Sequence, residues 1–183
     1  MTFGLGYLLT PPNKNYIFAL CQPYCLSLTM ASNNNDIAQA LTKGLLAGYG
    51  GQTEFKNVSR GGFSLKSSHY QGKDIVYHDE WTNGGGQEIV KLKNKTFTRV
   101  YAGGANDKTV STDLIIQKLI YFIKNLGLKT RLFSDVQLSD GDWRYSYLIL
   151  DQNQDLNITV GKEIIIFQNQ IVFTHFFVLS PVK

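Results

Sequence analysis

The chain has 183 residues, of which 43% are apolar and 17% are charged, so it can bury one substantial core and no compositional bias demands a second. Its 10 Tyr and 11 Phe are typical of a β-rich protein with aromatic strand faces and exclude an intrinsically disordered chain. The formal charge of +4 is too small to indicate a nucleic-acid partner.

The first 31 residues have a different character from the rest. Their apolar stretch, residues 16–30, is interrupted at Gln22-Pro23 and is shorter than the roughly 20 residues that a membrane span needs. We predict an N-terminal arm over 1–31, which is disordered, a weak signal segment, or a consequence of a start that belongs at Met30. The predicted location is the cytoplasm, with secretion or the periplasm as the alternative.

Both cysteines, Cys21 and Cys25, lie in this arm. A Cys-x-x-x-Cys pair without nearby histidines lacks the four ligands of a closed zinc site, so we predict neither a metal nor a cofactor. A cysteine-free body is consistent with the reducing cytoplasm.

A first helix is predicted to begin after the polar run Ser32-Asn33-Asn34-Asn35, with Asp36 in its first turn. An apolar stripe follows at a spacing of four residues, at Ile37, Leu41 and Leu45, and stops at Gly48. The Gly- and Ser-rich stretch up to Gly72 predicts loops with one or two edge strands.

A strand over 74–81 is predicted to lead through a glycine turn at 83–86 into a hairpin. The hairpin has strands at 87–93 and 96–101, with Asn94-Lys95 as a two-residue turn. A second helix follows Ser111-Thr112-Asp113 and ends at Gly127. Beyond it we predict a strand at 129–133, a polar link at 134–142, and strands at 143–150, 157–167 and 171–179.

The chain also repeats itself. Gly86-Gln87-Glu88-Ile89-Val90 returns as Gly161-Lys162-Glu163-Ile164-Ile165, and the segment 97–101 returns at 173–177. We therefore predict one α+β domain over 32–183, built from two repeats at about 35–104 and 111–179. Short connections favour antiparallel pairing, so the helices should pack on one face of a curved antiparallel sheet.

The repeated hairpin carries the candidate site. With the turn at Asn94-Lys95, Glu88 faces Tyr101 and becomes a diagonal neighbour of Arg99 on the core-seeking face. The second copy places Glu163 on the matching face and aligns His175 with Arg99. These acids and bases framed by aromatic rings could line a cavity that binds a polar ligand, or they could be structural ion pairs that hold the register.

Two further candidates, Tyr77 and His78, come from the strand before the hairpin. His78 and Glu80 can share a site only without Asp79, because neighbouring strand residues point to opposite faces. No third metal ligand stands at a recognisable spacing. The glycine clusters read as turns, and no nucleophile motif is present.

The chain resembles an uncharacterised bacterial domain family that occurs alone or behind a helix-turn-helix DNA-binding domain. The resemblance rests, in order, on Tyr77-His78-Asp79, 86–90, 101–104, Trp143 and Tyr145, and 161–165, and covers roughly residues 40–179. It implies a compact α+β domain and no activity. The last strand departs from the glycine-rich close of that family.

The prediction for function is a non-enzymatic domain that binds a small polar or aromatic ligand, or a protein partner, on a concave aromatic sheet face. The candidate residues are Glu88, Arg99, Tyr101, Glu163, His175, Tyr77 and His78. One alternative is an acid-base enzyme that uses a Glu/His pair in the same pocket. Another is an interaction module that pairs through an exposed sheet edge or the N-terminal arm.

Overall fold

The computed structural model describes residues 24–48, 55–106, 108–126 and 134–182. Within them, nine antiparallel strands form one sheet in the order β1-β2-β3-β4-β5-β9-β8-β7-β6. Two helices accompany the sheet, α1 (Tyr24–Ala47) and α2 (Thr112–Leu126). The strands are β1 (Lys56–Arg60), β2 (Phe63–Gln71), β3 (Ile75–Thr82), β4 (Gly85–Leu92), β5 (Lys95–Ala105), β6 (Val136–Asp140), β7 (Trp143–Asn153), β8 (Ile158–Phe167) and β9 (Gln170–Val182).

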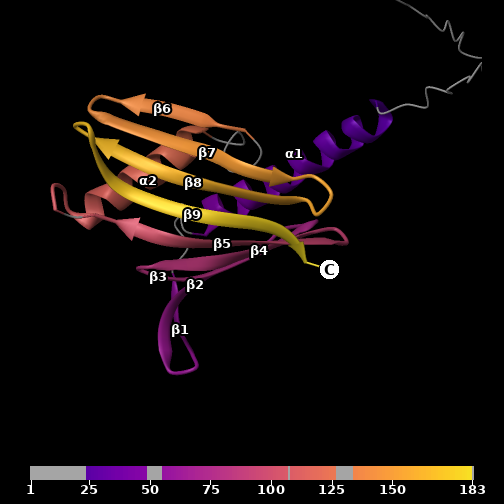
Figure 1. Ribbon diagram of the computed structural model, residues 1–183. Coiled ribbons are helices and arrows are strands. Elements are labelled where there is room, and N and C mark those ends of the chain that lie inside the picture. Colours follow the sequence, from indigo (N-terminus) through magenta and orange to yellow (C-terminus); the bar gives the residue numbers. More distant parts are fainter. Residues whose placement is uncertain (1–23, 49–54, 107, 127–133, 183) are drawn as a thin grey trace, which may run out of the picture.

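The chain order explains the sheet order. Helix α1 precedes the run β1 to β5, helix α2 precedes the run β6 to β9, and the two runs join where β5 pairs with β9. Both helices lie behind the strongly twisted sheet in Figure 1, on the same face. The predicted α+β class is thus confirmed. In the described residues, neither helix is long and apolar enough to cross a membrane.

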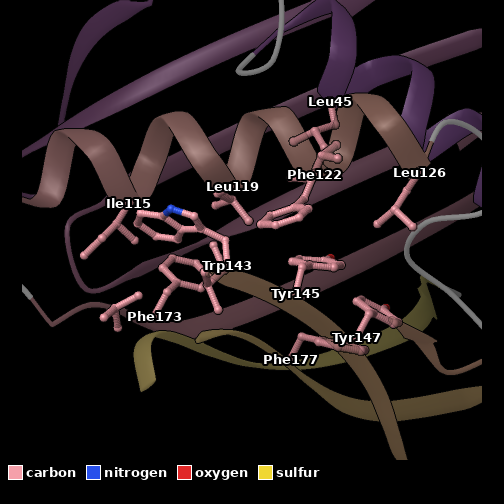
Figure 2. Close-up of a cluster of buried hydrophobic side chains, with 13 residues drawn as sticks. Leu45, Ile115, Leu119, Phe122, Leu126, Trp143, Tyr145, Tyr147, Phe173 and Phe177 are labelled. Carbon is pink, nitrogen blue, oxygen red and sulfur yellow. The ribbon is translucent and has the colours of Figure 1, made fainter. Parts of the chain in front are cut away.

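Each helix buries an apolar stripe chiefly against one set of strands, although Leu45 of α1 also packs in the cluster under α2. From α1, Ile37 and Leu41 pack with Tyr77 and Val90 of the first run. From α2, Ile115, Leu119, Phe122 and Leu126 face the rings of the last strands, as Figure 2 shows. The rings in that layer are Trp143, Tyr145, Tyr147, Phe173 and Phe177. In this part of the core, a layer of aromatic strand residues is therefore covered by helix residues that are aliphatic except for Phe122.

Helix α2 begins as the sequence predicts. The backbone N–H of Leu114 donates to the Ser111 hydroxyl at 3.4 Å, and Asp113 stands in the first turn, where the helix dipole favours a carboxylate. Lys124 in the last turn complements the other end of the dipole. Local sequence and tertiary burial therefore favour the same helix.

Two predicted boundaries are wrong. Helix α1 already includes the run 32–35, because Ser and Asn inside a helix cost only about 0.5 kcal/mol each relative to Ala and a continuing helix overrides their preference for caps. The link 134–142 contains strand β6, in which half-buried Val136, Leu138 and Asp140 alternate with exposed Gln137 and Ser139. The strand predicted at 129–133 lies outside the described residues.

The turn of the first hairpin lies one residue earlier than predicted, which shifts the strand pairing by two residues. Leu92 pairs with Lys95, so Lys93-Asn94 forms the turn, with Lys93 at a φ of 55°. A two-residue shift leaves every side chain on its predicted face, and the apolar pattern therefore could not distinguish the two registers. As a result, Glu88 faces Arg99 directly and is not its diagonal neighbour.

Candidate functional site

A buried ionic cluster joins the two runs of strands. The Arg99 guanidinium on β5 donates from Nη1 to Glu88 Oε2 at 2.7 Å, and its Nη2 lies 3.6 Å from Glu163 Oε2 on β8. All three side chains are at most 1% exposed. Buried charges are tolerated only when they are paired and hydrogen-bonded, so Arg99 holds both carboxylates in place.

Two tyrosines complete the support of these carboxylates. Tyr77 on β3 donates its hydroxyl hydrogen to Glu88 Oε1 at 2.8 Å, and Tyr145 on β7 donates to Glu163 Oε1 at 2.5 Å. Each tyrosine stands one strand away from its glutamate. Hydrogen bonds to an ionised acceptor are roughly twice as strong as neutral ones, so the cluster fixes the register of β3 on β4 and of β7 on β8.

The hydroxyl of Tyr101 reaches over a neighbouring strand to an acid. Tyr101 on β5 pairs with Gly86 on β4, and its hydroxyl oxygen lies 3.1 Å from Asp79 Oδ1 on β3. A Cβ at Gly86 would lie 2.7 Å from that hydroxyl oxygen, so the glycine leaves room for the ring. Burial and the charges of Asp79 and Glu88 raise the pKa of Tyr101 well above its ordinary value, although Arg99 opposes them. Tyr101 therefore stays a hydrogen-bond donor.

His175 on β9 lies beside this group. Its ring centroid is 5.0 Å from that of Tyr101 and 4.3 Å from that of Phe173. Its Nδ1 is 3.9 Å from Glu163 Oε2, which is longer than a hydrogen bond. The imidazole side chain is 15% exposed, so one part of it faces open space.

That open space is a cavity of about 780 Å³ between α2 and the inner face of the sheet. Helix α2 provides an aliphatic wall that includes Ile116, Leu119, Ile120 and Ile123. The strands provide a wall of acids and rings, made of Asp79, Trp81, Glu88, Tyr101, Phe173 and His175. The cavity therefore has an apolar wall from α2 and a polar, aromatic wall from the strands.

The structure brings together six of the seven predicted site residues. Glu88, Tyr101 and His175 line the cavity, whereas Arg99, Glu163 and Tyr77 are fully buried and contact the lining residues or their partners.

The seventh, His78, lies on the opposite face of the sheet. Its Nε2 is 3.1 Å from Glu80 Oε1, which also accepts from Arg60 Nη2 at 2.8 Å. For Glu80, burial acts to raise the pKa, but the bonds from His78 and Arg60 outweigh it and lower the pKa. The prediction that placed His78 in the same site as Tyr77 was inconsistent with strand alternation, since consecutive strand residues point to opposite faces.

The sequence reasoning missed Asp79 and Trp81. Both share the inner face of β3 with Tyr77, and all three are buried. The signal was present, because the same alternation that removes His78 from the site places residues 77, 79 and 81 together.

Comparison with protein-family models, with curated proteins and with solved structures found no match to this chain. The resemblance to a bacterial domain family stays a prediction. In the described residues, no group of three or more His, Cys, Asp or Glu side chains is arranged to hold a metal ion.

Proposed function

We propose that this protein is a ligand-binding domain that holds a small molecule of mixed polar and aromatic character in the cavity beside α2. The observation that carries the proposal is the cavity itself. Small-molecule sites are typically clefts of about 300–1,000 Å³ with mostly apolar walls and a few fixed polar groups. A volume of about 780 Å³ lies within that range.

The polar groups of the cavity are held rigidly. Glu88 is bonded to both Tyr77 and Arg99, and Tyr101 is bonded to Asp79. Side chains that are locked before a ligand arrives lose little conformational freedom on binding, which favours affinity and orientation. A preorganised polar wall of this kind supports binding of a small molecule over docking of a protein partner.

The acid-base alternative receives less support. A general base must lie within hydrogen-bonding reach of the proton it takes, or one water away. Glu163 is fully buried behind the cavity wall, and His175 Nδ1 is 3.9 Å from it. The geometry is that of a ring packed near an ion pair.

A cavity-filling variant tests the proposal. Ile116→Trp places an indole in the cavity, whereas Leu114→Trp adds the same group to an exposed position of the same helix that does not line it. The wild-type protein and both variants are purified identically and extracted, and small molecules are identified by untargeted mass spectrometry. We expect a compound that accompanies the wild type and Leu114→Trp and is depleted at least about tenfold from Ile116→Trp.

A compound present in equal amounts in all three proteins would contradict the proposal, as would the absence of any protein-dependent compound. Circular dichroism on each variant confirms that it is folded before extraction.

We also propose that the chain is internally duplicated. Supporting this, Tyr77 and Glu88 pair with their neighbours as Tyr145 and Glu163 do, and Glu88 faces Arg99 as Glu163 faces His175. Relatives of this chain provide the test. If the halves share an origin, profiles built from residues 35–104 and 111–179 should align with Glu88 on Glu163. An alignment in any other register would contradict duplication.

A further inference from the structure

The face of the sheet opposite the two helices carries an apolar patch at its centre. Figure 1 shows α1 and α2 together behind the sheet, so this face lies toward the viewer. On it, Val100 of β5 and Val178 of β9 form a cross-strand pair and are 49% and 44% exposed. Phe176, two residues before Val178, is 54% exposed, and Ile89 of β4, diagonal to Val100, is 37% exposed. Exposed apolar clusters of this kind mark interaction sites, and this one lies where the two runs of strands join.

Opposite charges flank the patch on its two sides. On one side, Lys162 of β8 pairs across the ladder with Phe176. On the other side, Glu80 of β3 pairs with Gln87, which is itself the cross-strand partner of Val100. Strands β4, β5 and β9 separate β3 from β8, a distance of about 19 Å at the usual strand spacing. The two side chains therefore cannot meet within one chain.

Both charged groups can accept a further partner. Glu80 Oε1 accepts from Arg60 Nη2 at 2.8 Å and lies 3.1 Å from His78 Nε2, and within the described residues no bond ends on Glu80 Oε2. Lys162 is half-buried beside Phe176 and has no ion pair in the part of the chain that the structure describes. An acceptor oxygen stands on one side of the patch and an ammonium on the other.

From this arrangement we propose that the partner of the patch is a second copy of the same chain, and that two copies pack sheet on sheet. A two-fold axis that runs roughly along the central strands lays each side of the patch over the opposite side in the other copy. Lys162 of each copy then lies near Glu80 of the other, and the apolar side chains meet between them. An uncharged centre with one acid and one cation at its borders fits a copy of itself better than a polyanion such as a nucleic acid.

The face is large enough for such a contact. Its six central strands, β3, β4, β5, β9, β8 and β7, each have at least 8 residues. At about 4.8 Å between strands and about 3.4 Å per residue, they cover roughly 800 Å². A standard protein–protein contact buries about 800 Å² per partner. Packed sheets also keep their strand directions within about 30° of each other, which an axis along the central strands provides.

Sedimentation velocity on the full chain tests the proposal, over concentrations from about 1 to 100 μM. We expect the wild type to shift with concentration toward twice the chain mass of 20.6 kDa. Val178→Lys places a charge at the centre of the contact and should weaken association at least about tenfold. Leu156→Lys makes the same change in the turn between β7 and β8, at a residue that is 51% exposed and outside the patch, and should leave association unchanged.

A charge exchange shows whether the contact has the proposed geometry. Glu80→Lys and Lys162→Glu each bring like charges together twice in the symmetric dimer, and each should weaken association at least about fivefold. The double variant has opposite charges again and should return to within about threefold of the wild type. Because the two positions are far apart in one chain, this rescue requires contact between copies. The exchange also decides the question if circular dichroism shows that Val178→Lys does not fold.

A wild-type chain that stays monomeric up to about 100 μM would overturn the inference. A dimer that Val178→Lys weakens no more than Leu156→Lys does would also overturn it, as would a double variant that associates no more tightly than the two single variants. The cavity lies on the other face of the sheet, so capture of a ligand there is measured independently and neither result depends on the other.

Discussion

The runs β3–β5 and β7–β9 have the same pairing but different chemistry. In each, a tyrosine donates to a glutamate on the next strand, and a glycine faces an aromatic residue, Gly86 with Tyr101 and Gly161 with Phe177. The position of Asp79 in the first run is held by Tyr147 in the second, since each faces the glutamate.

The difference decides what these matching positions contribute, although both runs reach the cavity, the second through Phe173 and His175 of β9. The Tyr101 hydroxyl donates to Asp79 across Gly86. Tyr101 and Asp79 both line the cavity, whereas Gly86 does not. Phe177 stacks on Tyr147 at a centroid distance of 4.8 Å, with 19° between the rings, inside the closed core shown in Figure 2. The same pairing pattern therefore places polar groups against the cavity in the first run and stacks two rings in the core in the second.

The largest expected effect comes from Arg99, the residue that both runs share. Arg99→Met leaves Glu88 and Glu163 buried without their guanidinium, and breaking a buried ion pair on one side typically costs about 3–5 kcal/mol. We expect the free energy of unfolding to fall by this amount at pH 7, as measured by urea denaturation with the slope of the transition compared between proteins.

A matched variant shows whether charge is the cause. Adding Glu88→Gln and Glu163→Gln to Arg99→Met removes the charges of the two carboxylates that Arg99 contacts, at nearly constant volume, and should recover part of the lost stability. A loss below about 1 kcal/mol for Arg99→Met would show that the cluster is not an energetic link between the runs.

The two glycines give the next largest effect and separate stability from binding. A Cβ at Gly86 would lie 2.5 Å from the Glu80 carbonyl oxygen, and one at Gly161 would lie 2.5 Å from that of Leu148. Both alanine variants should lose about 2–3 kcal/mol, as overpacked sites do. Only Gly86→Ala displaces a ring that lines the cavity, so only it should lower the amount of compound captured with the purified protein, measured by mass spectrometry.

Equal amounts of captured compound in the two alanine variants would contradict the conclusion that only the first run places its glycine-paired ring against the cavity. Chemical denaturation of each variant establishes that the protein is folded at the temperature of the purification.

The element types followed from the sequence because alternation and helical periodicity are local. The stripe Ile37, Leu41, Leu45 and the face of α2 predict helices, and both helices are observed. The register of the first hairpin and the edge strand β6 were predicted less well from the sequence. A two-residue shift in the pairing of the hairpin that turns at Lys93-Asn94 preserves every face, and β6 has only half-buried apolar positions to signal a strand.

The candidate site was predicted in part. Reading the hairpin placed Glu88, Arg99, Glu163 and His175 on one face, which is where they lie. That Arg99 also reaches Glu163 depends on the pairing of β5 with β9, a contact between distant segments that no local pattern encodes. The cavity depends on how α2 rests on the sheet, so neither its volume nor the role of Ile116 could be read from the chain.

The smallest expected effect tests whether the two runs are coupled through Arg99. Tyr77→Phe and Tyr145→Phe each remove one hydrogen bond to a buried carboxylate and should cost about 1.5 kcal/mol, whereas Tyr121→Phe, at an exposed position of α2, should cost almost nothing. Because both glutamates face one guanidinium, loss of one phenol lets Arg99 move toward the other carboxylate. The double variant should therefore depart from the sum of the single variants by at least about 0.5 kcal/mol in a double-mutant cycle measured by urea unfolding. Additivity within about 0.3 kcal/mol would mean that each glutamate responds only to its own strand neighbours, and that the two runs share a sheet without sharing an electrostatic core.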